Sequence, residues 1–165
     1  MSAVPSPAVP QLRFATLEEA QLGEVAAIES SVYAFPWSQG NFRDSLFSGY
    51  DCIGAWHGRE LIGYAITMPA LEEMHLLNLA VRKQWQRRGV GGAILQHLID
   101  AAVPTRCEVI YLEVRPTNIA GLRLYERFGF RQLGLRRDYY PALTGREDAL
   151  FLGLNIKART VDAAG

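Results

Sequence analysis

A basic, glycine-rich turn carries the clearest chemical signal in this sequence. An apolar segment ends near Val81, the run Gln86-Arg-Arg-Gly-Val-Gly-Gly92 follows, and an amphipathic pattern typical of a helix begins there. Glycines let the backbone approach an anion closely, and the free amides of a helix N-terminus attract it. The turn therefore predicts a phosphate-binding site, and a tight strand-to-helix connection is the alternative interpretation.

The residues of this turn argue against two common kinds of phosphate ligand. The turn has neither the Gly-x-Gly-x-x-Gly of a dinucleotide site nor the Gly-Lys-Ser/Thr of a nucleoside triphosphate loop. Arg87 and Arg88 lie inside the turn and are the best candidates to meet phosphates. Arg82 and Lys83 lie close by, and the four charges could also form a solvated cluster.

Two further side chains could accept and donate a proton. Glu113, near the end of an apolar segment, could take a proton from an ammonium group directly or through a water, and partial burial would raise its pKa usefully. It could equally be a structural carboxylate paired with Arg115 or Arg82. Tyr125 could protonate a suitably positioned thiolate, because phenols and thiols titrate near about pH 10 and about pH 8.5. A core position is the commoner role of such a tyrosine.

Length and charge limit the classes of function. The 165 residues suit one domain, and 17 acidic against 17 basic residues create no global field for nucleic acid or an anionic membrane. The three histidines lack metal-site spacing, so no metal is predicted. Cys52 and Cys107 are expected to be buried thiols in a reducing cytoplasm. No signal peptide or membrane span is evident, and residues 1–10 are expected to form a flexible tail.

Hydrophobic periodicity divides the rest of the chain into strands and helices. The predicted strands are 11–15, 51–57, 60–68, 73–81, 107–114, 130–138 and 147–155. The predicted helices are 17–33, 38–48, 89–103 and 118–127, with Thr16, Ser38 and Asn118 as candidate N-caps and with Phe42, Leu46 and Phe47 turned inward. The strand at 107–114 is apolar enough to be buried on both faces.

This order of elements predicts an α/β fold in one domain, with a mixed central β-sheet of about six to seven strands and helices on both faces. The helix at 89–103 would be a crossover that makes strands 73–81 and 107–114 parallel. Ligands of such sheets bind at the carboxyl ends of the strands, where the glycine turn and Glu113 both lie.

Several separated segments give the chain a family resemblance. The motif Gln86-x-x-Gly89-x-Gly91 resembles the pyrophosphate-binding motif of the Gcn5-related N-acetyltransferase (GNAT) superfamily, whose members move an acetyl group from acetyl-coenzyme A to an amine. The similarity covers about residues 11–156, leaving tails at 1–10 and 157–165. The segments that resemble one branch, the RimI-type enzymes that acetylate the N-terminal alanine of a bacterial ribosomal protein, are Phe35-Pro-Trp37, Leu112-Glu-Val-Arg115, Leu124-Tyr-Glu126 and Tyr139-Tyr-Pro141.

The resemblance implies roles for particular residues. Glu113 would be the general base and Tyr125 the general acid. A backbone amide of residues 79–81 would stabilise the oxyanion if the strand leaves it unpaired. Contacts with acetyl-coenzyme A are implied for Leu79, Ala80, Val81, Arg87, Arg88, Gly89, Val90, Gly91, Gly92 and Asn118, and capping a helix is the alternative role of Asn118.

The expected substrate is a protein N-terminus, most simply that of a ribosomal protein. Phe35 and Trp37 on one side, and Tyr139 and Tyr140 on the other, could form the walls of a peptide channel or simply cover the core. An α-amine with a pKa near about 8 keeps more neutral nucleophile than a lysine near about 10.4. The alternatives are a lysine or small-molecule amine acetyltransferase and a non-catalytic acyl-coenzyme A-binding module. A monomer in the cytoplasm is expected, with no direct contact to nucleic acid or membrane.

Overall fold

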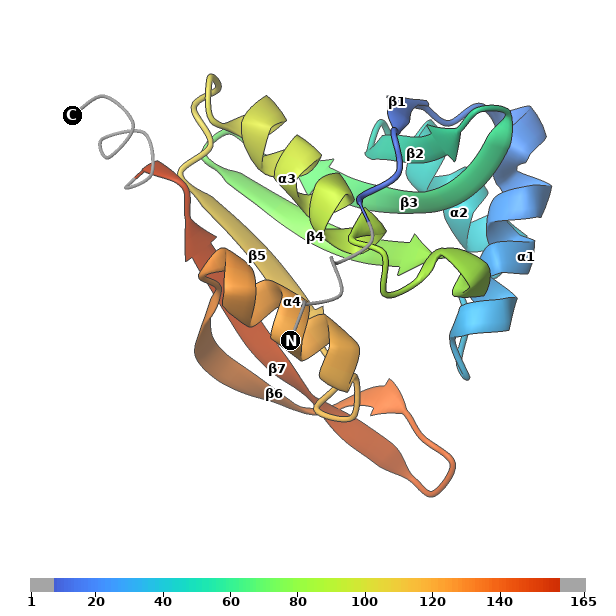
Figure 1. Ribbon diagram of the computed structural model, residues 1–165. Coiled ribbons are helices and arrows are strands. Elements are labelled where there is room, and N and C mark those ends of the chain that lie inside the picture. The colour runs from blue at the N-terminus through green and yellow to red at the C-terminus, as the bar shows by residue number, and fades with distance from the viewer. Residues whose placement is uncertain (1–7, 158–165) are drawn as a thin grey trace, which may run out of the picture.

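The computed structural model describes residues 8–157 and contains one seven-stranded mixed sheet with the strand order β1-β2-β3-β4-β5-β7-β6 (Figure 1). The strands are β1 (Arg13–Thr16), β2 (Asp51–His57), β3 (Glu60–Pro69), β4 (Glu73–Val81), β5 (Val109–Val114), β6 (Arg131–Pro141) and β7 (Arg146–Asn155). The helices are α1 (Leu22–Val32), α2 (Gln39–Phe47), α3 (Val90–Ala102) and α4 (Ile119–Phe128). The predicted fold class is confirmed.

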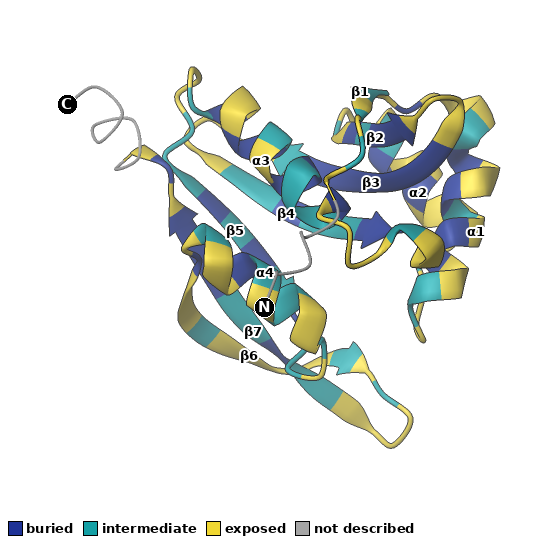
Figure 2. Cartoon of the chain, viewed as in Figure 1, coloured by how far each residue is buried: buried dark blue, intermediate teal, exposed yellow. Residues whose placement is uncertain are grey.

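Helices cover both faces of the sheet and create two hydrophobic clusters. The apolar side of α3 packs with α4 against β3, β4, β5 and β7, and its buried residues are Val90, Ile94, Leu95, Leu98, Ile99 and Ala102. On the other face, α1 and α2 pack against β2, β3 and the end of β4. Figure 2 shows that the exposed residues concentrate on the outer sides of the helices and along β6.

The parallel strands β4 and β5 separate partway along their length. Their pairing runs from Glu73 opposite Val109 to Leu76 opposite Leu112, whereas β4 continues to Val81. A bulge in β4 at the same level shifts its register with β3 between Ile66 and Thr67. Bulges bend a strand and increase its twist, so the ends of β4 and β5 diverge and leave an opening in the sheet.

The helix that follows each of these strands begins and ends at residues suited to its termini. Gly89 is the N-cap of α3 in the left-handed conformation, with φ of 80°. Asn118 caps α4, because its Oδ1 accepts a hydrogen bond from the Gly121 amide at 3.0 Å. Gly129, with φ of 95°, ends α4 as expected. The caps fix where both helices start relative to the opening between β4 and β5.

Two predictions about the first helices were wrong. The helix expected from Leu17 instead begins with a 3₁₀ turn at Glu19, capped by Glu18 and not by Thr16, which ends β1. Leu17 is buried, and its amide donates to the Cys52 carbonyl at 2.8 Å, so pairing with β2 replaces the first helical turn. Phe47 is 69% exposed because it follows the inward-facing Leu46 by one residue, about 100° around the helix.

Two predictions about burial were also wrong. β5 is buried on one face only, because α1 and α2 cover the sheet from β2 to β4 and leave the face of Val109, Tyr111 and Glu113 half open. Cys107 precedes β5 and is only partly buried, whereas Cys52 is buried as expected. The predicted tails at 1–10 and 157–165 fall mainly outside the described residues.

Candidate active site

The opening between β4 and β5 exposes backbone groups of β4. The Arg82 amide donates to the Ile62 carbonyl at 2.8 Å, and the antiparallel alternation then turns the amides of Leu79 and Val81 away from β3 and toward the opening. The Leu79 carbonyl accepts a hydrogen bond from the Tyr33 hydroxyl, and the Val81 carbonyl accepts one from Gln86 Nε2 at 3.0 Å. The amides of Leu79 and Val81 are therefore placed to donate to a ligand in the opening.

The glycine-rich turn lies directly after this part of β4. Arg87 and Gly89 both adopt positive φ, 62° and 80°, so the backbone curls tightly before α3. The N-cap residue Gly89 has no side chain to cap the first turn of α3, so it leaves the amides of that turn available to an anion. The guanidinium of Arg88 stacks over the Trp85 ring at 4.3 Å from its centroid, and Gln86 ties the turn to β4. The phosphate site predicted from the sequence therefore falls on a tight turn at the N-terminus of α3.

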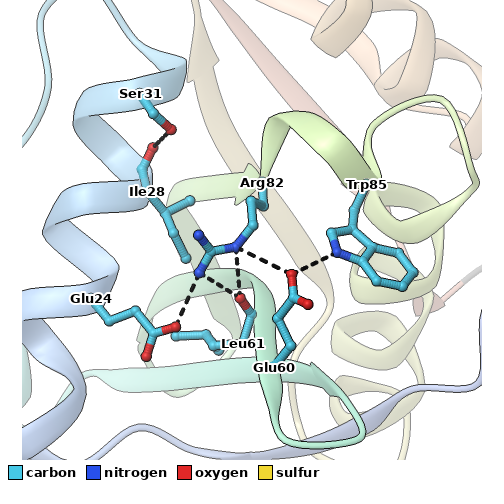
Figure 3. Close-up of polar contacts among 7 residues, drawn as sticks. All are labelled: Glu24, Ile28, Ser31, Glu60, Leu61, Arg82 and Trp85. Carbon is cyan, nitrogen blue, oxygen red and sulfur yellow. Dashed lines mark hydrogen bonds and ion pairs between the residues drawn. The ribbon is translucent and has the colours of Figure 1, made fainter.

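Arg82 has a structural role that separates it from the other basic residues (Figure 3). Its guanidinium donates to the Leu61 carbonyl from Nε and Nη2, at 3.1 and 3.0 Å, and to Glu24 at 3.0 Å. Glu60 lies 3.8 Å from Arg82 Nε and accepts a hydrogen bond from Trp85 Nε1 at 2.9 Å. The network anchors the end of β4 to β3 and α1, so Arg82 is not free to turn toward phosphates.

The two glycines of the motif should respond differently to alanine. Gly89 has φ of 80°, and a Cβ there would lie 2.7 Å from Val9 Cγ2, whereas a Cβ at Gly91 would meet Leu124 at an ordinary 3.4 Å. We expect Gly89→Ala to lower stability by about 1–2 kcal/mol and to weaken coenzyme A binding, because alanine disfavours left-handed backbone. Gly91→Ala should change both by much less. Calorimetric titration and urea unfolding would test this, and equal losses in the two variants would contradict it.

Glu113 lies at the opening, with its carboxylate held by two donors. His75 Nε2 is 2.5 Å from its Oε2, and Arg136 Nε is 2.9 Å from its Oε1. Burial alone would raise the pKa of Glu113, but the hydrogen bonds and charges of His75 and Arg136 outweigh it and lower that pKa below its ordinary value. The expected rise was therefore wrong, and Glu113 pairs with neither Arg115 nor Arg82, the partners named in the alternative interpretation. The carboxylate is ionised at neutral pH and has lone pairs left for a further donor.

Tyr125 projects from α4 into the same region. Its side chain is 8% exposed, and its ring contacts Phe130 edge-to-face at 5.5 Å between centroids. Burial raises its pKa to about 12, so the phenol stays protonated at neutral pH. Burial raises the pKa of Tyr33 and that of Tyr140, nearby Tyr125 raises both further, and Glu113 also raises that of Tyr140. Tyr125 of α4 and Glu113 of β5 therefore both lie near Tyr140.

Arg115 joins the two aromatic segments that were predicted to form channel walls. Its guanidinium lies 5.1 Å from the Phe35 ring centroid and 4.2 Å from that of Tyr140. Arg115 Nη1 also donates to the Pro141 carbonyl at 2.8 Å and to Glu147 at 3.0 Å. The side chain of Arg115 thus lies between the segment after α1 and the β6–β7 hairpin.

The aromatic side chains themselves differ in exposure. Phe35 and Tyr139 are 37% and 45% exposed, and Tyr140 contacts Tyr139 edge-to-face at 4.8 Å. Trp37 instead packs on Phe42 at 5.3 Å and joins the cluster beneath α2, so it also covers the core. Phe35 and Tyr139 are thus exposed to a ligand, whereas Trp37 and Tyr140 are partly buried.

Sequence reasoning missed several residues that complete the site. These are Glu29, Tyr33, His75 and Arg136. No local motif marks them, because each meets its partner only after strands or helices distant in sequence are paired. Among residues 8–157, no group of three or more potential ligands could hold a metal ion, and no helix is long and apolar enough to cross a membrane.

Glu29 is a buried carboxyl beneath the opening. It is 1% exposed, and Asn78 Nδ2 donates to its two carboxylate oxygens at 2.9 and 2.8 Å. Burial raises its pKa from 4.5 to about 7, and hydrogen bonds from Asn78 and the Trp37 backbone oppose that rise only in part. Glu29 therefore links α1, the bulged region of β4 and the segment of Trp37.

The pKa of Glu29 predicts a pH-dependent stability. A raised folded-state pKa stabilises the fold fully below the unfolded value of 4.5, and this contribution is lost as the pH rises through about 7. Between about pH 5 and about pH 7.5 we expect Glu29 to remove about 2 kcal/mol of unfolding free energy. In urea unfolding over the same pH range, the unfolding free energy of Glu29→Gln should fall less than that of the wild type, by that amount. Parallel wild-type and variant profiles would contradict the assignment.

The fold and site define an acetyltransferase. The chain belongs to the acetyltransferase (GNAT) family, whose profile matches residues 22–130. The ribosomal protein bS18-alanine N-acetyltransferase of Escherichia coli K12 is 38% identical over 141 residues, which cover 86% of this chain and 95% of that protein. The resemblance to the GNAT superfamily and to its ribosomal-protein alanine branch is thus confirmed.

Solved structures agree with this assignment. The crystal structure of the Escherichia coli ribosomal-protein-S18-alanine N-acetyltransferase has a TM-score of 0.82 and 37% identity, covering 88% of this chain and 94% of that one. Arabidopsis thaliana NAA60 in complex with acetyl-CoA has a TM-score of 0.77 at 18% identity, covering 88% and 99%, and shows the fold alone.

Proposed function

We propose that this acetyltransferase transfers the acetyl group of acetyl-coenzyme A to the α-amine of a protein N-terminus that begins with alanine, and that its substrate is ribosomal protein S18. The observation that carries the proposal is the convergence of Glu113 and Tyr125 at the opening between β4 and β5. Similarity to enzymes named for that substrate supports the choice of amine.

The cofactor is proposed to lie along the opening. Its pyrophosphate would meet the free amides at the start of α3, with Arg87, Arg88, Gly89, Val90, Gly91 and Gly92 around it. The rest would follow Leu79, Ala80 and Val81, and the outward amides of Leu79 and Val81 suit an acceptor such as the thioester carbonyl. The side chain of Asn118 is engaged as a cap, with its amide nitrogen left to donate to the cofactor.

The proposed reaction is a direct attack of the amine on the thioester. Glu113 takes the ammonium proton directly or through a water, and the neutral nitrogen then bonds to the carbonyl carbon. Outward amides of β4 stabilise the oxyanion. When the carbon–sulfur bond breaks, the nitrogen loses its second proton to solvent, and the sulfur leaves as a thiolate that accepts a hydrogen bond or a proton from Tyr125. A weakly basic Glu113 suits an α-amine better than a lysine, because the α-ammonium is more acidic by about 2 pKa units.

The peptide is proposed to enter between the segment of Phe35 and Trp37 and the hairpin that carries Tyr139 and Tyr140. Arg115 sets the separation of the two walls. We propose that residues 11–156 form the catalytic domain and that the enzyme acts as a cytoplasmic monomer, where its ribosomal substrate is made. We expect no direct contact with nucleic acid or membrane, in keeping with the balanced charge.

One experiment tests the proposal and its rivals. The protein is incubated with acetyl-coenzyme A and a peptide that begins with alanine and contains an internal lysine, and fragmentation mass spectrometry locates the acetyl group. Acetylation of the α-amine is the expected result. Acetylation of the lysine would identify a lysine acetyltransferase. Cofactor binding without transfer to either amine would contradict the proposal and favour another amine substrate or a non-catalytic acyl-coenzyme A-binding module.

A further inference from the structure

His75 and Glu113 form a direct pair at the site. In the parallel register His75 of β4 lies opposite Tyr111 of β5, so Glu113, two residues further along β5, shares the same face of the sheet. His75 Nε2 is 2.5 Å from Glu113 Oε2. The side chain of His75 is 24% exposed and that of Glu113 is 8% exposed, so water reaches the imidazole more easily than the carboxylate.

The other groups around the pair carry a fixed charge or none. Arg136 of β6 occupies Oε1 of Glu113 and keeps its charge at every relevant pH. In the sheet, Met68 of β3 and Tyr111 of β5 lie opposite His75, and neither is charged near neutrality. The hydroxyls of Tyr139 and Tyr140 also sense the charge of Glu113, but burial raises the pKa of each, so they too stay neutral. Imidazole is the side chain that ordinarily changes charge between about pH 5 and 8.

The protonation state of His75 changes the chemistry open to Glu113. A neutral imidazole that donates Nε2–H to the carboxylate leaves Nδ1 free to accept a proton from water. Protonation at Nδ1 places a positive charge beside the carboxylate, and this charge lowers the affinity of Glu113 for the proton of the substrate amine. The neutral form of His75 is therefore the form that supports a general base.

We infer that His75 is a positioning residue that holds Glu113 through Nε2–H and, by its own protonation, sets how readily Glu113 accepts the proton of the amine. The inference rests on the proposed function, because it assigns a partner to the base of that reaction. It predicts an acidic limb of the pH profile that belongs to His75, in addition to the limb that comes from the substrate amine.

Replacement of His75 by Gln tests the inference, because the Gln amide can still donate to Glu113 but does not titrate. kcat/KM for an alanine peptide is measured from about pH 6 to about pH 8.5 in wild type, His75→Gln and the control His97→Gln. His97 stacks on Phe14 at 4.2 Å between ring centroids and is remote from the pair. The substrate amine affects all three profiles equally. We expect kcat/KM of the wild type divided by that of His75→Gln to fall about tenfold between about pH 8 and about pH 6. The same quotient for wild type and His97→Gln should stay constant over this range.

A ratio that does not change with pH would show that His75 is only structural and would overturn the inference. An inactive wild type would instead contradict the proposed function. In that case the pair is tested without catalysis, by following the His75 ring protons in NMR titrations of wild type and Glu113→Gln. The two titration curves should differ, because Glu113→Gln removes the charge that faces the imidazole. An unchanged midpoint would overturn the inference whether or not the enzyme is active.

Discussion

Replacement of Glu113 by Gln is expected to lower kcat by about 10³-fold while acetyl-coenzyme A binds with nearly unchanged affinity. Glu113 is the ionised carboxylate that the structure places at the opening between β4 and β5, with one lone pair on each oxygen left after His75 and Arg136 donate. Gln keeps the size of the side chain but cannot accept the proton of an ammonium group. The loss should therefore fall on turnover and not on cofactor affinity.

The control for this variant is Glu108→Gln. Glu108 precedes β5 and pairs on the surface with Lys157 at 2.7 Å, so the same chemical change is made at the other end of the strand. Steady-state kinetics with an alanine peptide and calorimetric titration of acetyl-coenzyme A give the two readouts. A Glu113→Gln enzyme that retains more than about a tenth of wild-type kcat would remove Glu113 from the proposed role as base.

Replacement of Tyr125 by Phe is expected to lower kcat by about 10²-fold, less than the loss at Glu113. Burial raises the pKa of Tyr125 to about 12, so complete transfer of its proton to a thiolate is uphill by about 3 pKa units. The phenol therefore acts mainly as a hydrogen-bond donor to the sulfur while the carbon–sulfur bond breaks. Phe keeps the edge-to-face contact with Phe130 and removes only the donor.

The pH profile separates this role from others. Because Tyr125 stays protonated up to about pH 12, wild-type activity should show no alkaline loss from its ionisation below about pH 10. Tyr50→Phe, at the end of the α2 segment, is the matched control and should retain full activity. If Tyr125→Phe turns over at the wild-type rate, another group must protonate or hydrogen-bond the leaving sulfur.

Local sequence patterns were enough to predict most of the fold. β4 has the predicted bounds, and β2 and α3 match within a residue, because their periodicity is bounded by turns or by glycine and proline. The prediction failed where tertiary contacts overrode local preference. Leu17 pairs with Cys52 and so delays the first helix, and Phe47 looks apolar in sequence yet points away from the core.

The features of the candidate site also divide into those that the local sequence predicts and those that depend on tertiary contacts. The sequence by itself determined the glycine turn, the cap at Asn118, the place of Glu113 near the end of β5 and the place of Tyr125 on α4, because each depends on neighbours within a few residues or on a family motif. Only the tertiary structure decided the pKa of Glu113. Its partner His75 is 38 residues away and Arg136 is 23 residues away, and their contacts depend on the register of three separate strands. A shift of one residue in any of these strands would turn the side chain to the other face of the sheet, so the composition of each strand alone cannot specify the pairing.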